Sequence, residues 1–475
     1  MISAAFTDLY ELTMAQGYLV HGMDRPAVFE AFFRHHPFGG GYSVFAGLGP
    51  LLEDLENLRF HPEDLAYLEA RGLFSREFLA YLEAFRFRGD VWSVPEGEVV
   101  FPREPLLRVR GGLVECQIVE GLLLNRVNFQ SLVATKTARI RHAAKGGKVM
   151  EFGLRRAQGP DGANSATRAS FIGGAVGTSN VLGARLYGIP ALGTMAHSWV
   201  MAFPSEREAF EAYADLYPDS TIFLVDTYDT LASGVPNAVA AGRRLAEKGK
   251  RFGIRLDSGD IQYLAEESRK MLDAAGFRDA FIVASNDLDE EIIEALTAAG
   301  APVEVWGVGT RLVTGGSDSA FSGVYKLAAV DRGNGMESAM KFSDNPDKST
   351  EPGVKDVYRL YDENGQARAD VLAAEGEVLE PGVPRTFHHP ALDTRRFRMT
   401  PCGRIRPLLE KVLEGGKPLG SPPPLEAARD RCREELERFD PTYRRLLNPH
   451  VYKVSITDAV RDLKASFLER YRSGS

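Results

Sequence analysis

A compact group of charged and small residues could bind a phosphorylated ligand. The segment RLDSGD places Arg255, Asp257 and Ser258 within four positions, directly after an apolar run. Arg255 can neutralise an anion, and Asp257 can hold a ribose hydroxyl or a phosphate-bound Mg²⁺, because hard cations take carboxylate oxygens. Ser258 and the following glycine let the chain approach a ligand closely. A polar strand end without function is the alternative interpretation.

Three other segments carry groups suited to oxyanions. EFGLRR places Arg155 and Arg156 after an apolar run, and guanidinium groups are the preferred partners of phosphate and carboxylate oxygens. The segment that follows, 159–180, is rich in Gly, Ser and Thr, which offer backbone N–H and hydroxyl donors. GVGTRL at 307–312 has the small residues of a terminal-phosphate site. The alternatives are a salt-bridged surface pair, a loose loop and a tight turn.

Two further residues follow apolar runs of the same kind. His197, just beyond IPALG, could act as an acid or base or accept a phosphoryl group, although a lone histidine can equally be structural. LVDTYDTLASG superficially resembles the ribose-phosphate loop of open-sheet phosphoribosyltransferases. Its acids Asp226 and Asp229 are separated by two residues instead of adjacent, and no TGGT-like segment follows. We therefore interpret it as another strand-end loop.

The elements that must position these residues are short apolar strands alternating with helical segments from about 147 to 330. Alternation of strand and helix predicts parallel pairing, and near-continuous apolar strands are buried on both faces. A polar cluster follows almost every strand, which favours a closed α/β barrel over an open sheet, because barrel loops all converge on one rim. The predicted strands are GKVMEFG, IPALGT, STIFLVDT, RFGIRLD, DAFIVAS, PVEVWGVG and GVYKLAAV.

The regions before and after this series do not show its regular alternation of strands and helices. Residues 1–145 mix helix and strand signals and end in a long pattern of helical periodicity over 114–144, expected to bridge two domains. Residues 146–345 are expected to form the catalytic barrel. Residues 346–475 are expected to return to the first domain. That last region is predicted to contain a hairpin, DVYRLYDENGQARADVLA, and a helix, PPPLEAARDRCREELERF.

Composition narrows the class of protein. The 475 residues suggest two or three folding units, with 44% hydrophobic and 26% charged residues. A net charge of −8 disfavours nucleic-acid binding, and no apolar stretch approaches the length of a membrane span. Cys116, Cys402 and Cys432 are widely separated, which argues against a disulfide frame or a zinc site. We expect a cytoplasmic protein with no nucleic-acid or membrane partner.

Seven segments, taken together and in chain order from residue 7 to about 330, resemble nicotinate phosphoribosyltransferases. They are TDLYELTMAQGY, FFRHHPFGGGYSVFAGL, EFGLRRAQGPDGANSATRASFIGG, GTSNVLGARLYGIPALGTMAHSW, DTYDT, IRLDSGD and WGVGTRLVTGGSDSAFSGVYKL. The resemblance implies an irregular TIM-like α/β barrel joined to a second, α/β sandwich-like domain built from the N- and C-terminal regions. It also implies a homodimer with shared active sites.

The resemblance implies an activity as well. Such enzymes, classed as ligases, form nicotinate mononucleotide and pyrophosphate from nicotinate and 5-phosphoribosyl-1-pyrophosphate in NAD biosynthesis. They couple this transfer to ATP hydrolysis, so that Mg²⁺ is the expected cofactor and ATP a co-substrate. By this resemblance, His197 is transiently phosphorylated by ATP. The GTxAH pattern around it is intact.

The same resemblance assigns roles around the pyridine ring. Phe152 and Tyr10 of the partner subunit would sandwich the ring, since an electron-poor heteroaromatic gains from stacking. Arg255 and Thr194 would bind near nicotinate, with Arg255 a natural partner for its carboxylate. Arg155 would serve the pyrophosphate side.

The remaining roles concern phosphoribose. Asp226 and Asp257 would orient ribose or metal-bound phosphate, and Ser258 lies beside them. The 5-phosphate would be held by Gly307, Gly309 and Thr310.

One position bears on the choice between acid and amide. Relatives that use nicotinamide place an aspartate where this sequence has Ser179, and a carboxylate there would accept from an amide and repel a carboxylic acid. We therefore predict nicotinate as the substrate. The alternatives are a nicotinamide phosphoribosyltransferase, a decarboxylating quinolinate-type enzyme, and a non-catalytic barrel that binds a phosphorylated metabolite.

Overall fold

The computed structural model describes the chain except for residues 1, 344–347, 393, 400–402, 422 and 474–475. The chain divides into two compact units, one formed by residues 1–132 with 320–475 and the other by residues 133–319. The first boundary falls within the long helix α6 (Glu120–Ala143). The expected boundary between 345 and 346 lies outside the described residues.

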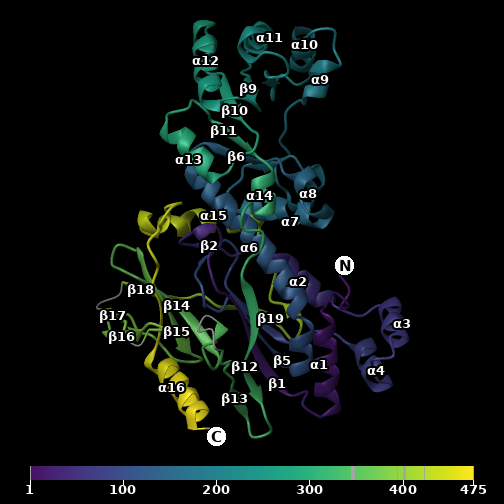
Figure 1. Ribbon diagram of the computed structural model, residues 1–475, viewed down its shortest axis with the longest axis vertical. Helices are drawn as coiled ribbons and strands as arrows, with labels where there is room; N and C mark the ends of the chain where they lie inside the picture. Colours follow the sequence, from purple (N-terminus) through teal and green to yellow (C-terminus); the bar gives the residue numbers. More distant parts are fainter. Residues whose placement is uncertain (1, 344–347, 393, 400–402, 422, 474–475) are drawn as a thin grey trace. The chain divides into compact units, whose positions relative to one another are not determined.

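The second unit is built on a six-stranded parallel sheet (Figure 1) in the order β7-β6-β11-β10-β9-β8. Strands β8 to β11 are neighbours in chain order, and β11 returns to β6. This confirms the predicted parallel pairing. Its strands are β6 (Lys148–Glu151), β7 (Gly177–Thr178), β8 (Ile222–Leu224), β9 (Gly253–Leu256), β10 (Phe281–Ala284) and β11 (Val305–Val308).

Two predicted strands of this series differ from expectation. IPALGT contributes only one parallel bridge, between Ala191 and Thr178, at the β7 edge of the sheet. GVYKLAAV forms β12 (Gly323–Asp331), which pairs antiparallel with β1 (Pro26–Phe33) in the first unit, so its prediction as a further parallel strand is wrong. The pairing partner lies almost 300 residues earlier, where a local pattern carries no information about it.

Helices follow these strands because polar residues in the loops cap their first turns. Asn180 accepts from Gly183 N at 3.0 Å, Asp260 from Tyr263 N at 3.1 Å, and Asp289 from Ile292 N at 3.0 Å. The helical elements are α7 (Gly159–Ile172), α8 (Val181–Tyr187), α9 (His197–Met201), α10 (Glu206–Leu216), α11 (Val235–Glu247), α12 (Ile261–Ala274), α13 (Glu290–Ala298) and α14 (Thr310–Thr314), with short turns η2 (Leu154–Arg156) and η3 (Thr230–Gly234).

A small apolar cluster joins these strands on one face of the sheet. Met150, Ile222, Val283 and Val305 are buried there, and Phe152 packs against them. Side chains alternate along a strand, so Met150 and Phe152 share this face while the residue between them points to the other. The cluster therefore fixes the end of β6 where the first predicted site residues lie.

The first unit contains, among the described residues, a seven-stranded antiparallel sheet and a six-stranded mixed sheet. The first has the order β13-β12-β1-β5-β3-β19-β20 and the second β17-β16-β21-β15-β14-β18. The bounds not yet given are β2 (Ser43–Val44), β3 (Asp90–Ser93), β4 (Val99–Val100), β5 (Leu107–Gly112), β13 (Met336–Ser338), β14 (Lys355–Tyr361), β15 (Ala367–Ala374), β16 (Arg385–His388), β17 (Arg396–Met399), β18 (Arg404–Pro407), β19 (Glu410–Glu414), β20 (Lys417–Pro418) and β21 (Val454–Ile456).

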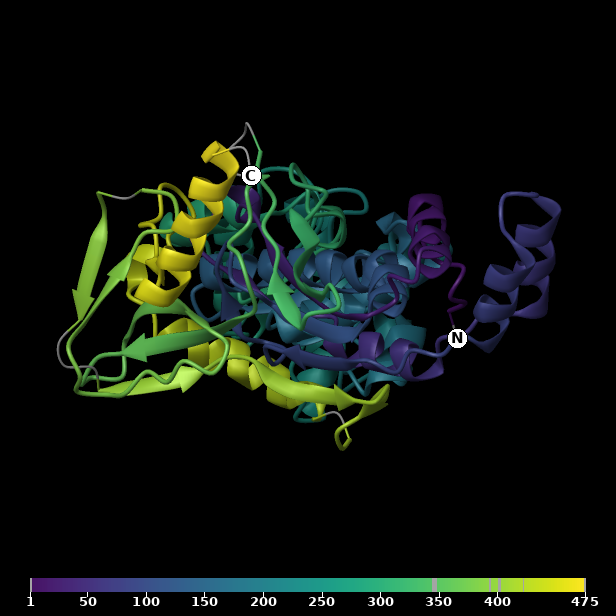
Figure 2. The same ribbon diagram turned by 90° about the horizontal axis from the view of Figure 1, so that it is seen from below.

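Helices complete the first unit. In Figure 2, α3 and α4 form a hairpin that stands apart from the sheets, and α16 packs on β15 and β16. The predicted C-terminal hairpin and helix are confirmed as β14–β15 and α15. The bounds are α1 (Leu9–Val20), α2 (Leu48–Asn57), α3 (Pro62–Ala70), α4 (Arg76–Ala84), α5 (Leu113–Ile118), α15 (Leu425–Glu437) and α16 (Asp458–Ser473), with short turns at Pro37–Gly39 and Pro441–Tyr443.

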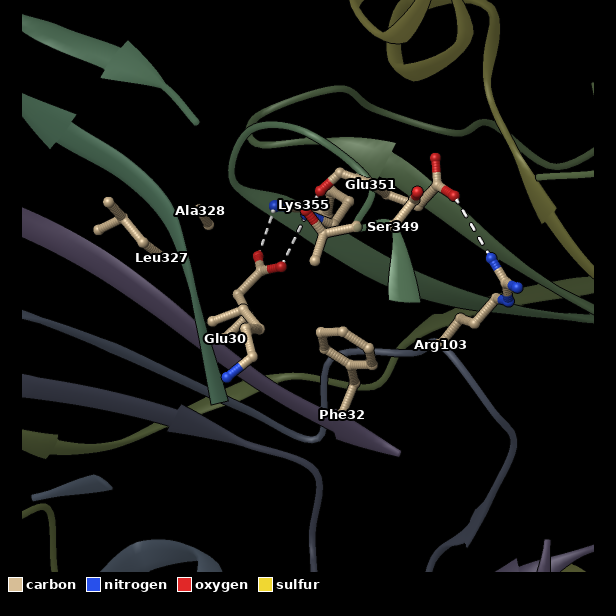
Figure 3. Close-up of a pocket in the computed structure, with 10 residues that line it drawn as sticks. Glu30, Phe32, Arg103, Leu327, Ala328, Ser349, Glu351 and Lys355 are labelled. Carbon is tan, nitrogen blue, oxygen red and sulfur yellow. Dashed lines mark hydrogen bonds and ion pairs between the residues drawn. The ribbon is translucent and has the colours of Figure 1, made fainter. Parts of the chain in front are cut away.

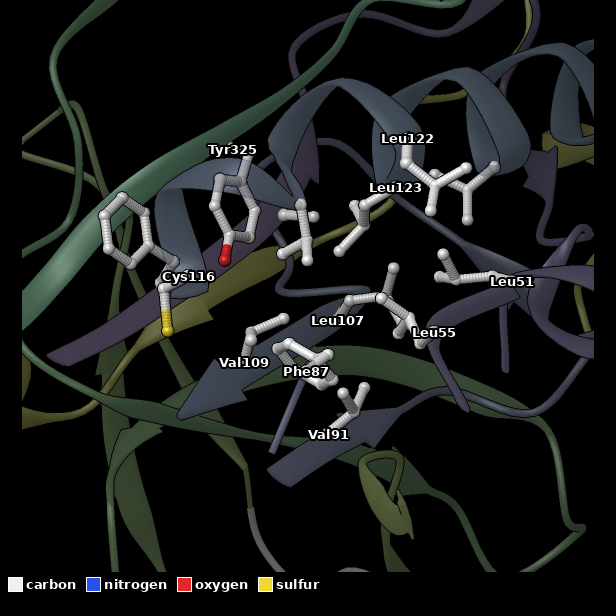
Figure 4. Close-up of a cluster of buried hydrophobic side chains, with 14 of the residues drawn as sticks. Leu51, Leu55, Phe87, Val91, Leu107, Val109, Cys116, Leu122, Leu123 and Tyr325 are labelled. Carbon is white, nitrogen blue, oxygen red and sulfur yellow. The ribbon is translucent and has the colours of Figure 1, made fainter. Parts of the chain in front are cut away.

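The core of the first unit is large and apolar (Figure 4). Leu55 from α2, Leu107 from β5 and Leu123 from α6 are all 0% exposed and lie in this cluster. Each such side chain stabilises the fold by about 1.5–3 kcal/mol relative to an exposed one. Cys116 is buried in the same core, Cys432 is also a buried free thiol, and Cys402 lies outside the described residues.

A search of the described residues finds no helix long and apolar enough to cross a membrane.

Candidate active site

The second unit has a pocket of about 340 Å³ at the carboxyl ends of its parallel strands. This volume is in the range of small-molecule sites. Ten of the predicted residues line it, and they lie at the carboxyl ends of β6, β7, β9 and β11 or in the segments that follow these four strands. They are Phe152, Arg155, Ser179, Thr194, His197, Arg255, Asp257, Gly307, Gly309 and Thr310.

A cavity in the first unit is much smaller, at about 20 Å³ (Figure 3). Glu30 and Lys355 face each other across it with an Nζ to Oε2 distance of 2.7 Å, and Arg103 lies 3.9 Å from Glu351. Such a volume holds about one water molecule. The pocket of the second unit is therefore the better candidate for a substrate site.

Arg255 is held in one orientation at the pocket. Its Nε donates to Ser285 Oγ at 2.8 Å, one Nη to Thr194 Oγ1 at 2.7 Å, and the other Nη to Asp257 Oδ1 at 2.7 Å. These bonds use three of the five guanidinium N–H donors, and within the described part of the chain the other two have no partner. A planar anion in the pocket could therefore accept from Arg255.

Phe152 forms an aromatic wall beside this guanidinium. The Arg255 Cζ atom lies 5.6 Å from the centroid of the Phe152 ring. A Cβ atom at Gly307 would lie 2.7 Å from that ring, so a side chain at this position would displace it. The pocket thus pairs a surface for stacking with a cation for a carboxylate.

His197 stands at the start of α9 with 43% of its side chain exposed. Its Nδ1 lies 3.1 Å from Thr227 Oγ1, and its Nε2 lies 3.9 Å from Asp257 Oδ2. A hydroxyl that accepts from Nδ1–H leaves the Nε2 lone pair directed to the pocket. This arrangement suits an imidazole that acts as a nucleophile or a base.

Asp226 lies behind the pocket lining and orders the Asp257 loop. Its Oδ2 accepts from Asp257 N at 3.0 Å and from Ser258 Oγ at 2.5 Å. Its Oδ1 is buried and has no partner among the described residues.

Among the described residues, no group of three or more His, Cys, Asp or Glu side chains is placed so that it could hold a metal ion. Mg²⁺ nevertheless binds commonly through one or two carboxylates together with phosphate oxygens and water. Asp226 and Asp257 fit that requirement, because one offers an unpartnered buried oxygen and the other lines the pocket. They are the residues that would hold a Mg²⁺–phosphate group here.

The remaining predicted residues are distributed as follows. Arg155 is exposed on η2 at the pocket, and Gly309 and Thr310 form the turn from β11 into α14. Tyr10 lies on α1 in the first unit with 49% of its side chain exposed.

Several pocket residues escaped the sequence analysis. Ser285, Asn286 and Asp287 follow β10, and Thr227 contacts His197. Asn286 adopts φ of 111°, a conformation that residues other than glycine rarely occupy and that occurs preferentially at functional sites. The available signal was the polar segment that ends and follows the predicted strand DAFIVAS, but hydroxyl and amide side chains are too common in loops to be singled out.

The fold and the pocket define an α/β protein whose strand ends gather an aromatic ring, a guanidinium group and a carboxylate around one cavity. Three family models match the chain: the nicotinate phosphoribosyltransferase N-terminal domain at 6–128, the family domain at 147–360, and the C-terminal domain at 354–464. The chain belongs to the nicotinate phosphoribosyltransferase family.

Individual relatives agree with this assignment. The chain is 43% identical to a nicotinate phosphoribosyltransferase of Mycobacterium tuberculosis over 97% of this chain and 92% of the relative. It is 41% identical to the Bacillus subtilis nicotinate phosphoribosyltransferase over 95% and 92%. The crystal structure of human nicotinic acid phosphoribosyltransferase matches with a TM-score of 0.85 and 33% identity, covering 97% of this chain and 99% of the human chain.

Proposed function

We propose that the protein transfers the 5-phosphoribosyl group of 5-phosphoribosyl-1-pyrophosphate to the ring nitrogen of nicotinate, coupled to ATP hydrolysis. The products are nicotinate mononucleotide and pyrophosphate, which places the reaction in NAD biosynthesis. Family membership over nearly the whole chain supports the transfer. The single observation that carries the choice of substrate is Arg255 beside the Phe152 ring, since nicotinate is a flat ring with one carboxylate.

The transfer forms one bond and breaks one bond at the anomeric carbon. The pyridine nitrogen attacks C1 of the ribose as the C1–O bond to pyrophosphate breaks, so no base is needed. Asp226 and Asp257 would offset the positive charge that develops on the ribose, while Arg155 stabilises the leaving oxygens. Gly307, Gly309 and Thr310 hold the 5-phosphate. Catalysis is then positioning and electrostatics.

Mg²⁺ would act with the leaving group. When bound, it neutralises pyrophosphate oxygens and supports their departure. Asp226 and Asp257 are the carboxylates proposed to hold it.

His197 is the proposed acceptor of a phosphoryl group from ATP. Contact of Nδ1 with Thr227 supports this role, because in the tautomer whose Nδ1–H donates to the Thr227 hydroxyl the lone pair for the attack is on Nε2. Hydrolysis of the phosphohistidine would return the enzyme to its starting state and help to drive turnover.

Ser179 is the proposed determinant of the acid. It lines the pocket and is half-buried, and a hydroxyl there does not repel a carboxylate. The proposal also retains the finer architecture: an irregular TIM-like barrel formed by the second unit, a sandwich-like domain formed by the first, and a cytoplasmic homodimer whose sites receive Tyr10 of the partner subunit.

One assay tests the function. The protein is mixed with 5-phosphoribosyl-1-pyrophosphate and either nicotinate or nicotinamide, with and without ATP and Mg²⁺, and the products are separated and quantified. Nicotinate mononucleotide and pyrophosphate should form in equal amounts, faster with ATP, and chelation of Mg²⁺ should stop the reaction. Absence of the mononucleotide would reject the transfer, and equal use of nicotinamide would reject the role of Ser179.

A further inference from the structure

Glu151 is a buried carboxylate directly behind the wall of the pocket. It is the last residue of β6, a strand paired on both sides, and is 1% exposed. Because side chains alternate, Met150 and Phe152 face the pocket side while the Glu151 side chain points to the opposite face of the sheet. A carboxylate buried there is costly unless hydrogen bonds satisfy it. The hydrogen-bond partners of the Glu151 carboxylate therefore indicate its structural role.

The Glu151 carboxylate receives three hydrogen bonds, from one loop, one strand end and one helix. One oxygen accepts from Gly153 N in the turn that carries Phe152 and Arg155. The other accepts from Thr178 Oγ1 at the end of β7, and from Thr167 Oγ1 on α7 at 3.1 Å. The ring wall and the Ser179 loop are thus joined through one side chain.

Asn180 fixes the direction of these bonds. Its N–H donates to Thr178 Oγ1 at 3.0 Å, and its Nδ2 donates to Thr167 Oγ1 at 3.1 Å. Each hydroxyl accepts from Asn180 through a lone pair and keeps its one proton to donate; the nearer acceptor for both is Glu151 Oε2, since the two hydroxyl oxygens are 3.4 Å from each other. The three groups that face the carboxylate are therefore donors. Both carboxylate oxygens of Glu151 must act as acceptors.

Ser179 lies inside this network and is held on both sides. Its own N–H donates to Glu151 O at 2.9 Å. The residue before it bonds to the Glu151 carboxylate, and the residue after it bonds back to Thr178 Oγ1. Neither contact uses the Ser179 side chain, which stays available to the pocket.

We propose that Glu151 is a positioning residue that sets the distance between the Phe152 ring wall and Ser179, and thereby the preference for the acid over the amide. The inference rests on the proposed function, because it concerns recognition of the ring. Among the described residues, Arg255 and the Gly307–Thr310 turn make no hydrogen bond to the Glu151 side chain. Binding of the phosphoribosyl donor should therefore depend less on Glu151 than binding of nicotinate does.

Glu151→Gln is the sharpest variant, because it keeps the shape of the side chain. Its amide NH₂ must face either Gly153 N, where a donor meets a donor, or the two threonine hydroxyls, which must then turn their protons away from residue 151. Thr178→Val removes one link at nearly constant volume, and Thr178→Ser restores the hydroxyl. Glu290→Gln is the matched control: Glu290 is buried in the same unit but pairs with Lys136 and Arg139.

The experiment measures kcat and KM for nicotinate and for the phosphoribosyl donor, and the ratio of kcat/KM for nicotinate over nicotinamide. Glu151→Gln and Thr178→Val should raise the nicotinate KM about tenfold and lower the ratio about tenfold, with a smaller change in donor KM. Thr178→Ser should restore both values, and Glu290→Gln should leave the ratio unchanged. If Glu151→Gln fails to fold, Thr178→Val with its serine counterpart provides the same test.

The outcomes separate this inference from the function itself. Wild-type ratio and nicotinate KM in Glu151→Gln and Thr178→Val, or the same loss in Glu290→Gln, would overturn the role of Glu151 while the enzyme remains a nicotinate phosphoribosyltransferase. A wild-type protein that makes no nicotinate mononucleotide would overturn the proposed function and this inference with it.

Discussion

Two arginines in this protein are held by networks of opposite character. Arg359 in the first unit is 0% exposed and bonds to Asp370, Glu98 and Val99 O. Arg255 in the second unit bonds to one carboxylate and two hydroxyls and lines a pocket. A guanidinium surrounded by several acids has its charge neutralised, whereas one held by two hydroxyls and a single carboxylate keeps two N–H donors for a ligand. The chemical type of its hydrogen-bond partners thus distinguishes a structural arginine from an arginine that binds a ligand.

Ionisation in the first network supports this interpretation. Burial opposes ionisation of Glu98, but Arg359 and Arg406 hold its pKa below the usual range. Burial and the nearby Asp370 raise the pKa of Glu104 well above the usual range, which favours the neutral form of this side chain. The positive and negative charges of the cluster therefore balance one another, and little positive charge remains to attract an incoming anion.

The largest expected effect is on folding. Arg359→Met should lower the free energy of unfolding by about 3–5 kcal/mol, because buried carboxylates lose their cation. Urea denaturation followed by circular dichroism measures this loss. A stability equal to that of the wild type would show that Arg359 does not neutralise the cluster, and would remove the contrast with Arg255.

Arg255→Ala should weaken ligand binding and leave the stability of the fold nearly unchanged. We expect nicotinate binding to weaken about 100-fold, because the carboxylate loses a charged partner, with little change in the urea midpoint. Calorimetric titration with nicotinate measures the affinity. A strongly destabilised protein with unaltered affinity would make Arg255 a second structural arginine.

Glu11 is a buried acid outside the Arg359 ion-pair network, and its contribution to stability should depend on pH. Burial, followed by the charge of Glu120, raises the pKa of Glu11 on α1 to about 7, even though Thr7 and the Asp8 N–H donate to it. The folded state then holds a proton that the unfolded state releases above pH 4.5. Stability should therefore fall by about 2 kcal/mol as the pH rises from 4.5 through 7.

Glu11→Gln should flatten that profile, because the variant carries no titrating group at this position. Urea midpoints at a series of pH values compare the two proteins. Parallel profiles for the wild type and the variant would exclude Glu11 as the source.

The smallest expected effect concerns ATP. His197→Ala should abolish ATP hydrolysis and the stimulation by ATP, lowering turnover about tenfold to a slow ATP-independent rate. Thr227→Val should weaken the stimulation without abolishing it, since only the partner of Nδ1 is lost. ATP consumed per mononucleotide formed is the quantity to measure, and full coupling in His197→Ala would contradict the phosphohistidine.

Local sequence predicted much of the second unit. Arg255, Asp257 and His197 each follow an apolar run, and parallel strands bring their carboxyl ends to one edge, so adjacency follows from the strand order. The hydroxyls that orient them, Ser285 and Thr227, had no distinguishing pattern. They could be found only once the neighbouring strands were placed.

The first unit was less predictable because its contacts are remote. Glu98 and Arg359 are separated by 261 positions, and β12 pairs with β1 across a similar gap. No periodicity in either segment encodes such a partner. Arg359 and Asp370 are only 11 positions apart and face each other across the β14–β15 hairpin. The sequence predicted this hairpin but not the ion pair across it.

The account depends on Arg255 recognising the carboxylate of nicotinate, and Arg255→Gln assayed with nicotinate and nicotinamide in parallel tests this most directly. We predict that kcat/KM for nicotinate falls about 100-fold while that for nicotinamide changes little, so that the preference for the acid collapses. An equal loss with both rings, or no loss with nicotinate, would contradict it.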